Sequence, residues 1–213
     1  MNKQVFITSI ILTLFAVIGG GLVAFTEKST AAQIQFNEKQ SLLRTLNTII
    51  PSTQYDNDIT QSTITIAASP HLGTDKESVV YVAMKNKKPV AFIFNAIAPN
   101  GYNGKIYLLV GIYTDGRIAG TRVVKHRETP GLGDAIEERR SDWILGFNNH
   151  SLDSLSEKQW KVNRDGGEFD QFTGATITPR AVVKAVHQSL LYFNANKQQL
   201  LESASTSASN GEG

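Results

Sequence analysis

The chain has 213 residues, of which 41% are hydrophobic and 19% are charged, and its formal net charge is +2. These values suit one globular domain with appendages and argue against a disordered chain. Lysine and arginine are spread without a basic block, so we expect no nucleic-acid partner. The absence of cysteine excludes disulfides, iron–sulfur ligands and thiol nucleophiles from this chain. The four histidines, His71, His126, His150 and His187, are widely separated and form no zinc-binding motif, so we expect no metal site.

The first feature along the chain is an apolar segment. Residues 5–25 are 21 consecutive positions without a charge, and a bilayer core of ~30 Å requires about 20 helical residues. We therefore expect residues 1–28 to contain one transmembrane helix. A cleaved signal peptide is the alternative, with Thr30-Ala31-Ala32 as a weak cleavage site. The run is longer than the ~7–15 apolar residues usual in signal peptides, which favours an anchor.

The charges beside this segment predict its orientation. Lys3 precedes it, whereas Glu27 and Lys28 follow it and partly cancel each other. Positive charge tends to remain on the cytoplasmic side, so we expect a cytoplasmic N-terminus and an external domain. A single span cannot form a pore alone, and the chain is therefore predicted to be an anchored domain.

Residues 29–60 are predicted to be a membrane-proximal helix and linker. Apolar residues recur with helical spacing until Pro51, which ends the pattern. Five strand-like runs follow, and Asn86-Lys87, Asn100-Gly101 and Asp115-Gly116 mark turns between them. Asp115-Gly116 between two apolar runs is a specific hairpin signal. The predicted strands are residues 63–68, 79–85, 89–97, 106–113 and 118–125.

The second half of the sequence has a different character. A Pro/Gly-rich loop at residues 129–133 leads into a short helical or irregular stretch that ends near Phe147. A long helix is predicted to begin with Thr178 as N-cap and Pro179 at its first position. Residues 203–213 are rich in Ser, Gly and Asn and are predicted to be a disordered tail. The pattern indicates an α+β domain over residues 61–202, with an antiparallel sheet and packed helices.

Residues 170–176, which read DQFTGAT, lie just before that helix. Gly174 and Ala175 leave little bulk beside two hydroxyls, so a large group can approach the backbone. A helix N-terminus presents unpaired N–H groups and partial positive charge, which suit a phosphate on Thr176. The alternative is that Thr173, Thr176 and Thr178 only cap the helix and its turn, as threonine often does.

The same seven residues resemble the D-x-x-[ST]-G-A-[ST] motif of covalently flavinylated bacterial FMN-binding domains. In that family the last Ser or Thr carries FMN through a phosphoester, and a magnesium-dependent flavin transferase makes the bond from FAD. The resemblance implies one covalent FMN per chain. It places the bond on Thr176, with Asp170, Thr173, Gly174 and Ala175 around it.

A second segment is similar to the same family. Residues 126–133 read HRETPGLG, which matches the H-x-E-T-P-G-L-G loop that holds the isoalloxazine ring. Without the resemblance this stretch is an ordinary surface loop, and Ile136 excludes a GxGxxG dinucleotide fingerprint. The resemblance implies that Glu128, Thr129, Leu132 and Gly133 bind the cofactor.

From the anchor to the last helix, the whole chain resembles the G subunits of bacterial Rnf (also Rsx) electron-transport complexes. This implies an electron relay within an ion-translocating ferredoxin/NAD oxidoreductase, hence a translocase subunit without a catalytic site of its own. It implies a single pass through the inner membrane, a periplasmic domain, and partnership with the other membrane subunits, the flavin transferase and the lipid bilayer.

Several alternatives remain open at this stage. They are a C-type flavin subunit of a sodium-pumping NADH:quinone reductase, a free-standing reductase, and an anchored non-redox binding module. Some side chains also have two interpretations, as contacts of the flavin or (for the basic ones) of an acidic partner, or as ordinary packing and surface residues. These are His126, Trp143, Trp160, Arg139, Arg140 and Lys161.

Overall fold

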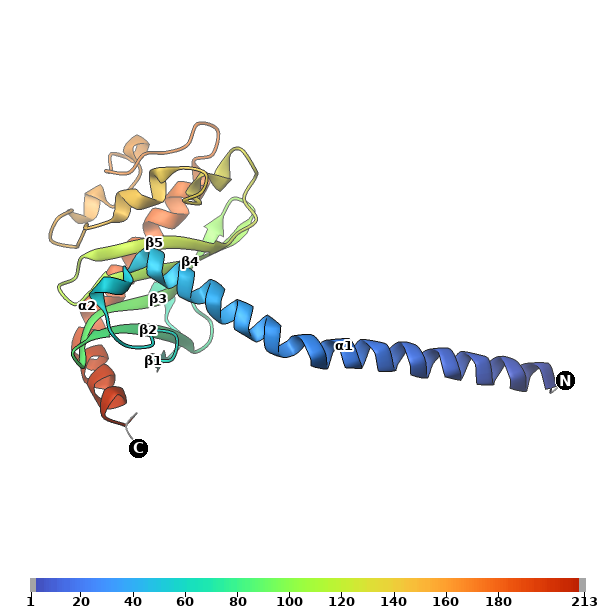
Figure 1. Cartoon of the computed structure of the whole chain (residues 1–213). Coiled ribbons are helices and arrows are strands. Elements are labelled where there is room, and N and C mark those ends of the chain that lie inside the picture. Colours follow the sequence, from blue (N-terminus) through green and yellow to red (C-terminus); the bar gives the residue numbers. More distant parts are fainter. Residues whose placement is uncertain (1–2, 211–213) are drawn as a thin grey trace. The chain divides into compact units, whose positions relative to one another are not determined.

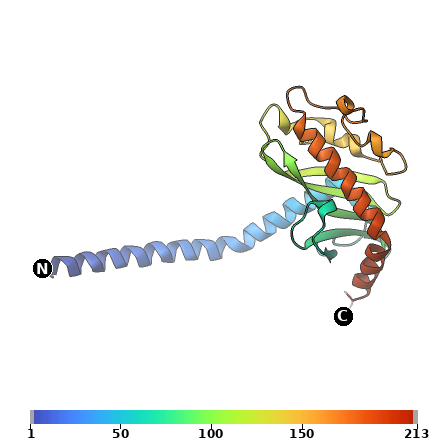
Figure 2. The same cartoon turned by 180° about the vertical axis from the view of Figure 1, so that it is seen from behind.

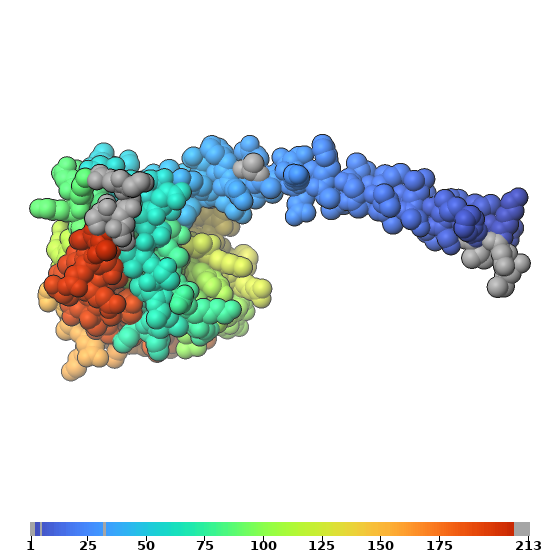
Figure 3. All heavy atoms as spheres, turned by 90° about the horizontal axis from the view of Figure 1, so that it is seen from below, coloured from blue at the N-terminus to red at the C-terminus, as the bar shows by residue number. Residues whose placement is uncertain are grey.

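The computed structural model describes residues 3–210 and divides into two compact units, Met1–Leu42 and Leu43–Gly213. The first unit consists of most of helix α1 (Lys3–Ile49). This helix is long and apolar enough to cross a membrane, and an 18-residue window of it has a mean hydropathy of 2.3. Phe6, Phe15 and Phe25 are 67–72% exposed, and Figure 3 shows this stretch, in blue, with its side chains outward. Such exposure suits a lipid-facing helix.

The second unit is built on a five-stranded antiparallel sheet in the order β1-β2-β3-β4-β5 (Figure 1). All five predicted strands are present, and the predicted α+β class is confirmed. Their bounds are β1 (Thr63–Ile66), β2 (Ser78–Lys85), β3 (Lys88–Gly101), β4 (Gly104–Tyr113) and β5 (Ile118–Lys125).

Two of the three predicted turns lie between strands as expected. Asn86 and Lys87 join β2 to β3 with φ of 51° and 61°, as a two-residue type I′ turn requires. Gly116, with φ 96°, lies in the turn between β4 and β5. The Asn100-Gly101 prediction was wrong, because β3 continues through Gly101 and Gly101 pairs with Gly104. The hairpin tip is therefore Tyr102-Asn103.

Helix α2 (Ile177–Asn210) covers one face of the sheet (Figure 2). Alternate residues of β3 point toward it, as the two-residue period of a strand dictates. The rings of Phe92 and Phe94 lie 6.0 and 6.3 Å from that of Phe193. All three side chains are fully or almost fully buried, and they form the centre of the core.

The opposite face of the sheet is partly covered by the last turn of α1, within the second unit. Gly111 of β4 and Gly120 of β5 make room for it, because a Cβ at Gly111 would lie 2.3 Å from a methyl group of Ile49. The guanidinium of Arg122 donates to the carbonyl oxygen of Thr48 at 2.7 Å. The end of α1 is thus both packed and hydrogen-bonded against the sheet.

Both ends of α2 differ from the sequence-based expectation. The helix begins at Ile177, so Thr178 lies inside its first turn and is not the N-cap. At the other end it continues to Asn210 through the segment expected to be disordered, while residues 211–213 lie outside the described part of the chain. Leu200 and Ala204 are buried, so the apolar periodicity extends beyond Ser203 and supports further helical turns.

Residues 133–175 form short 3₁₀ segments around a cluster of aromatic rings. The ring of Phe169 stacks on Phe147 at 4.5 Å and lies 5.4 Å from Trp160. Trp143 meets both Phe147 and Phe172 edge-on. Both tryptophans therefore pack within the domain, which is the simpler of their two interpretations.

His187 of α2 predicts a pH dependence of stability. It stacks on Trp160 at 5.2 Å, and burial lowers its pKa although the charge of Glu157 opposes this. Because the folded pKa lies below the unfolded value of about 6.5, the unfolded state takes up protons first as the pH falls. The midpoint temperature of unfolding should therefore be lower at pH 5 than at pH 7. His187→Gln should weaken this dependence, measured by thermal unfolding followed by circular dichroism.

Candidate functional site

A cavity of about 320 Å³ lies between the loop after β5 and the start of α2. Its size is at the lower end of the range for small-molecule sites, ~300–1,000 Å³. It brings together seven of the nine residues expected around a cofactor, from segments more than 40 positions apart. The lining residues are Tyr102, Glu128, Thr129, Leu132, Gly133, Gly174, Ala175, Thr176, Ile177 and Thr178.

The loop after β5 is folded by hydrogen bonds to its own backbone. The amides of Leu132 and Gly133 both donate to the carbonyl oxygen of Thr129, at 3.2 and 3.0 Å. Gly131 has φ 76°, a conformation that favours glycine. The loop therefore has a defined shape, with the Leu132 side chain at the cavity.

His126 fixes the beginning of this loop. Its Nδ1 accepts the Glu128 amide hydrogen at 3.0 Å, so the ring proton is on Nε2, which faces a carboxylate oxygen of Glu137 at 2.6 Å. Glu137 also pairs with Arg139. The hydrogen bond from Arg139 is the largest cause that lowers the pKa of the Glu137 carboxyl, and the hydrogen bond from His126 lowers it further. His126 and Arg139 thus support the loop and do not line the cavity.

The end of the 170–176 segment, Gly174 to Thr176, forms the opposite wall. The Ala175 amide donates to the Phe172 carbonyl oxygen at 3.2 Å, and Gly174 occupies this turn with φ 81°. A glycine is needed there because other residues are strained at positive φ. The turn places the half-buried Thr176 in the cavity wall, directly before the first residue of α2.

Asp170 and Thr173 are the two expected site residues outside the cavity lining. The Asp170 carboxylate accepts from the Asn163 amide at 2.6 Å, and its carbonyl oxygen accepts from the Trp143 indole at 2.8 Å. Thr173 is exposed at the turn. Asp170 thus fixes the start of the segment outside the cavity, through its hydrogen bonds with Asn163 and Trp143.

Glu128 is the most constrained polar residue of the site. It is buried, and its carboxylate accepts from the amides of Tyr102 and Asn103 at 3.2 and 3.0 Å. It also accepts the hydroxyl hydrogen of Thr178, which is fully buried. One carboxylate therefore connects the β3–β4 hairpin tip, the loop after β5 and the first turn of α2.

Three lining residues were absent from the set expected from the sequence: Tyr102, Ile177 and Thr178. Tyr102 and Ile177, which are 65% and 45% exposed, form an apolar rim together with the expected Leu132. Tyr102 arrives from a hairpin tip about 25 positions before the loop, and no local signal connects the two. Thr178 was assigned a capping role, but its hydroxyl faces Glu128.

The remaining charged candidates lie elsewhere. Arg140 pairs with Asp134 at 3.3 Å, and neither Arg140 nor Lys161 lines the cavity. Within residues 3–210, no three His, Asp or Glu side chains come together as a metal site.

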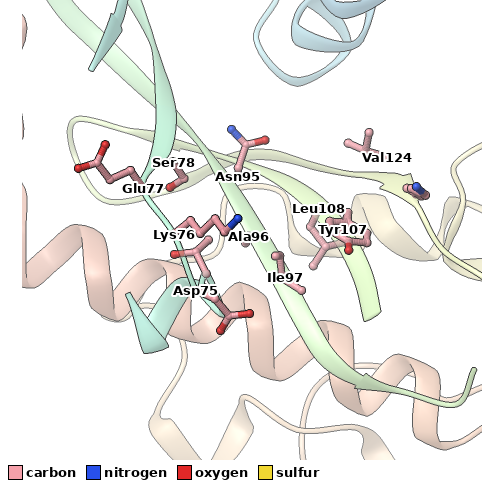
Figure 4. A pocket seen from close by; sticks show the side chains of 12 residues that line it. Asp75, Lys76, Glu77, Ser78, Asn95, Ala96, Ile97, Tyr107, Leu108 and Val124 are labelled. Atoms are coloured by element: carbon pink, nitrogen blue, oxygen red, sulfur yellow. The ribbon is translucent and has the colours of Figure 1, made fainter. Parts of the chain in front are cut away.

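A second hollow, of about 450 Å³, lies on the sheet (Figure 4). Its side chains come from the segment before β2 and from β3, β4 and β5, including Asn95, Ile97, Tyr107 and Val124. It is larger than the first hollow, but it has neither a helix N-terminus nor the two motifs. Lys76 and Lys125 line this larger hollow, but the smaller cavity holds the start of α2 and residues of both motifs and is therefore the better candidate for the functional site.

Gly133 allows the close packing of this site. A Cβ at this position would lie 2.9 Å from the Glu128 Cβ and 3.0 Å from the Thr178 hydroxyl oxygen. Gly133→Ala should therefore destabilise the domain by about 1–3 kcal/mol through overpacking. Gly146→Ala is a matched control, because nothing lies within 4 Å of its Cβ. Equal unfolding midpoints for the two variants would contradict this explanation.

Comparison with known proteins identifies the family. The FMN-binding domain matches residues 101–191, and the RnfG N-terminal region matches residues 1–49. The G subunit of the ion-translocating oxidoreductase complex from Pseudoalteromonas atlantica is 44% identical over 204 residues, covering 96% of this chain and 95% of that protein. The protein of the same name from Vibrio parahaemolyticus is 49% identical over 190 residues, covering 89% of this chain and 90% of that protein.

A crystal structure of Shewanella oneidensis NqrC is 22% identical, with a TM-score of 0.44 over 69% of this chain and 73% of that one. The near-complete matches confirm the resemblance seen in the sequence: the chain belongs to the family of G subunits of ion-translocating oxidoreductase complexes.

Proposed function

We propose that this chain carries one FMN, bound through a phosphoester to Thr176, and relays electrons within an ion-translocating oxidoreductase complex. The observation that carries the proposal is the position of Thr176. Its half-buried side chain lines a ligand-sized cavity directly before a long helix, within the residues that match the FMN-binding domain.

The residues around Thr176 fit a phosphate and an attached flat ring. Gly174 and Ala175 have little or no side chain, and the first amides of α2 supply hydrogen-bond donors and partial positive charge. The apolar rim of Tyr102, Leu132 and Ile177, together with Thr129, offers contacts to an aromatic ring. No Lys or Arg lines the described cavity, so the helix start is the main electropositive feature there.

The bound flavin would supply the redox chemistry, and the protein supplies attachment, orientation and electrostatics. The lining holds one hydroxyl–carboxylate pair, Thr178 and Glu128, but both residues are buried and bound to each other, so neither is placed to attack a substrate. We therefore assign a relay role, in which electrons arrive from one partner subunit and leave to another. The relatives are named as subunits of a complex, which supports such partners.

We further propose that α1 anchors the chain in the bacterial inner membrane, with the N-terminus in the cytoplasm and the domain in the periplasm. The apolar helix and the Lys3 charge support this arrangement. In that location a covalent bond would keep the flavin from diffusing away, and maturation would require a flavin transferase.

Intact-mass measurement of the chain purified from its native host tests the proposal. We expect a mass increase of one FMN less one water, and a fluorescent band under ultraviolet light after denaturing electrophoresis. A chain with flavin that is lost on denaturation would contradict covalent attachment. A colourless chain from a host with an active transferase would contradict the flavoprotein assignment and favour a non-redox binding module.

A further inference from the structure

Three threonine hydroxyls lie close to the start of α2, and their environments differ. Thr173 is exposed and outside the cavity lining. Thr178 is fully buried and donates to Glu128. Thr176 is half-buried in the cavity wall, and its hydroxyl has no hydrogen-bond partner in the described part of the chain. The structure therefore distinguishes one available hydroxyl from two unsuitable ones.

Glu128 is held in one position by its surroundings. Three donors, two from the hairpin tip and one from Thr178, occupy its two carboxylate oxygens. Two glycines allow this approach, because a Cβ at Gly101 or Gly133 would lie 2.9 Å from a Glu128 atom. A buried carboxylate with satisfied oxygens is a rigid element, and losing it leaves the buried Thr178 hydroxyl without its partner.

We propose that Glu128 is a positioning residue for flavin attachment. By binding Thr178, it fixes the first turn of α2 and removes that hydroxyl from competition. Of the threonines at the start of α2, Thr176, two residues earlier, is then the one whose hydroxyl the cavity presents. This inference rests on the proposed function, because it concerns how the same site acquires its cofactor.

The attachment step has a simple balance. The bond from the Thr176 oxygen to a phosphorus atom of FAD forms, and the phosphorus–oxygen bond of the pyrophosphate breaks. AMP leaves, the hydroxyl proton passes to a base of the transferase or to water, and no electron is transferred. Glu128 takes no proton in this step, because the hydroxyl that it binds is that of Thr178.

The test measures the initial rate of FMN attachment to the full-length chain, made without flavin and supplied with transferase, Mg²⁺ and FAD. Glu128→Gln and Thr178→Val should each lower the rate about tenfold, the scale of one lost hydrogen bond to a charged group. The double variant should be no slower than Glu128→Gln alone, because that change already disrupts the bond to Thr178. Thr178→Ser, which keeps the hydroxyl, should restore the rate.

Glu138→Gln is the matched control. It also removes a carboxylate, in this case one that pairs with Arg122 at 2.7 Å and does not line the cavity. Its rate should equal that of the unsubstituted chain. The positioning role is wrong if Glu128→Gln and Thr178→Val label at the normal rate, or if Thr178→Ser is as slow as Thr178→Val. If Glu128→Gln does not fold, the comparison of Thr178→Val with Thr178→Ser still tests the positioning role. An unsubstituted chain that never acquires flavin at Thr176 overturns the proposed function instead, and this inference with it.

Discussion

Thr176→Ala is expected to abolish covalent flavin while leaving the domain folded. The side chain is half-buried and its hydroxyl makes no hydrogen bond within the described chain, so its loss removes no internal interaction. We expect a change in unfolding free energy within about 0.5 kcal/mol, as for a substitution without a buried partner. Under the proposed function, by contrast, the substitution removes the oxygen through which the flavin is attached.

The neighbouring threonines should not replace Thr176. Thr178 has no exposed surface and its hydrogen is bound by Glu128, while Thr173 lies outside the cavity lining. Peptide mass mapping of Thr176→Ala should therefore find no flavin on either residue. Thr176→Ser should retain flavin, and Thr173→Ala, which removes a nearby exposed hydroxyl, is the matched control. A fluorescent band from Thr176→Ala would show that the attachment residue is wrong.

The strands could be predicted because each carries a local signal. Alternating apolar residues and the turn pairs Asn86-Lys87 and Asp115-Gly116 located the hairpins within a few positions. Asn100-Gly101 misled the prediction, because close contacts within strand pairing, and not a turn, require Gly101. A Cβ there would lie 2.4 Å from the Gly104 carbonyl oxygen and 2.9 Å from a Glu128 carboxylate oxygen. The sequence shows a glycine, but not whether a turn or a neighbouring side chain requires it.

The site could be predicted in part for the same reason. Thr176 and the 128–133 loop belong to two contiguous motifs, and the cavity brings these motifs together. Tyr102 contributes from a third segment, through a hairpin tip bound to Glu128 by backbone amides. Backbone amides are present at every position except proline, so such a contact leaves no trace in the sequence. The role of Thr178 was missed because its partner is 50 residues away.

Three lysines in the apolar part of α1 are expected to release the chain from the membrane. Leu12, Phe15 and Ile18 lie within the uncharged segment and are exposed along the helix. A lysine at the centre of a membrane helix costs about 2.5–3.5 kcal/mol on insertion scales, so three cost roughly 8–10 kcal/mol. Alkaline extraction of membranes should move Leu12→Lys/Phe15→Lys/Ile18→Lys from the pellet to the soluble fraction.

The control adds the same charge to the same helix beyond the apolar segment. Gln33→Lys/Asn37→Lys/Gln40→Lys changes three exposed or partly exposed polar residues and should remain in the pellet. Retention of the triple variant at Leu12, Phe15 and Ile18 in the pellet would mean that contacts other than the α1 span hold the chain at the membrane. The intact mass separates an anchor from a cleaved leader, because an anchor keeps residues 5–25 and cleavage near Ala32 removes them. A mature chain that lacks this segment would have no membrane span. The proposed relay needs a fixed position beside the membrane subunits, and contacts with those subunits would then have to provide it.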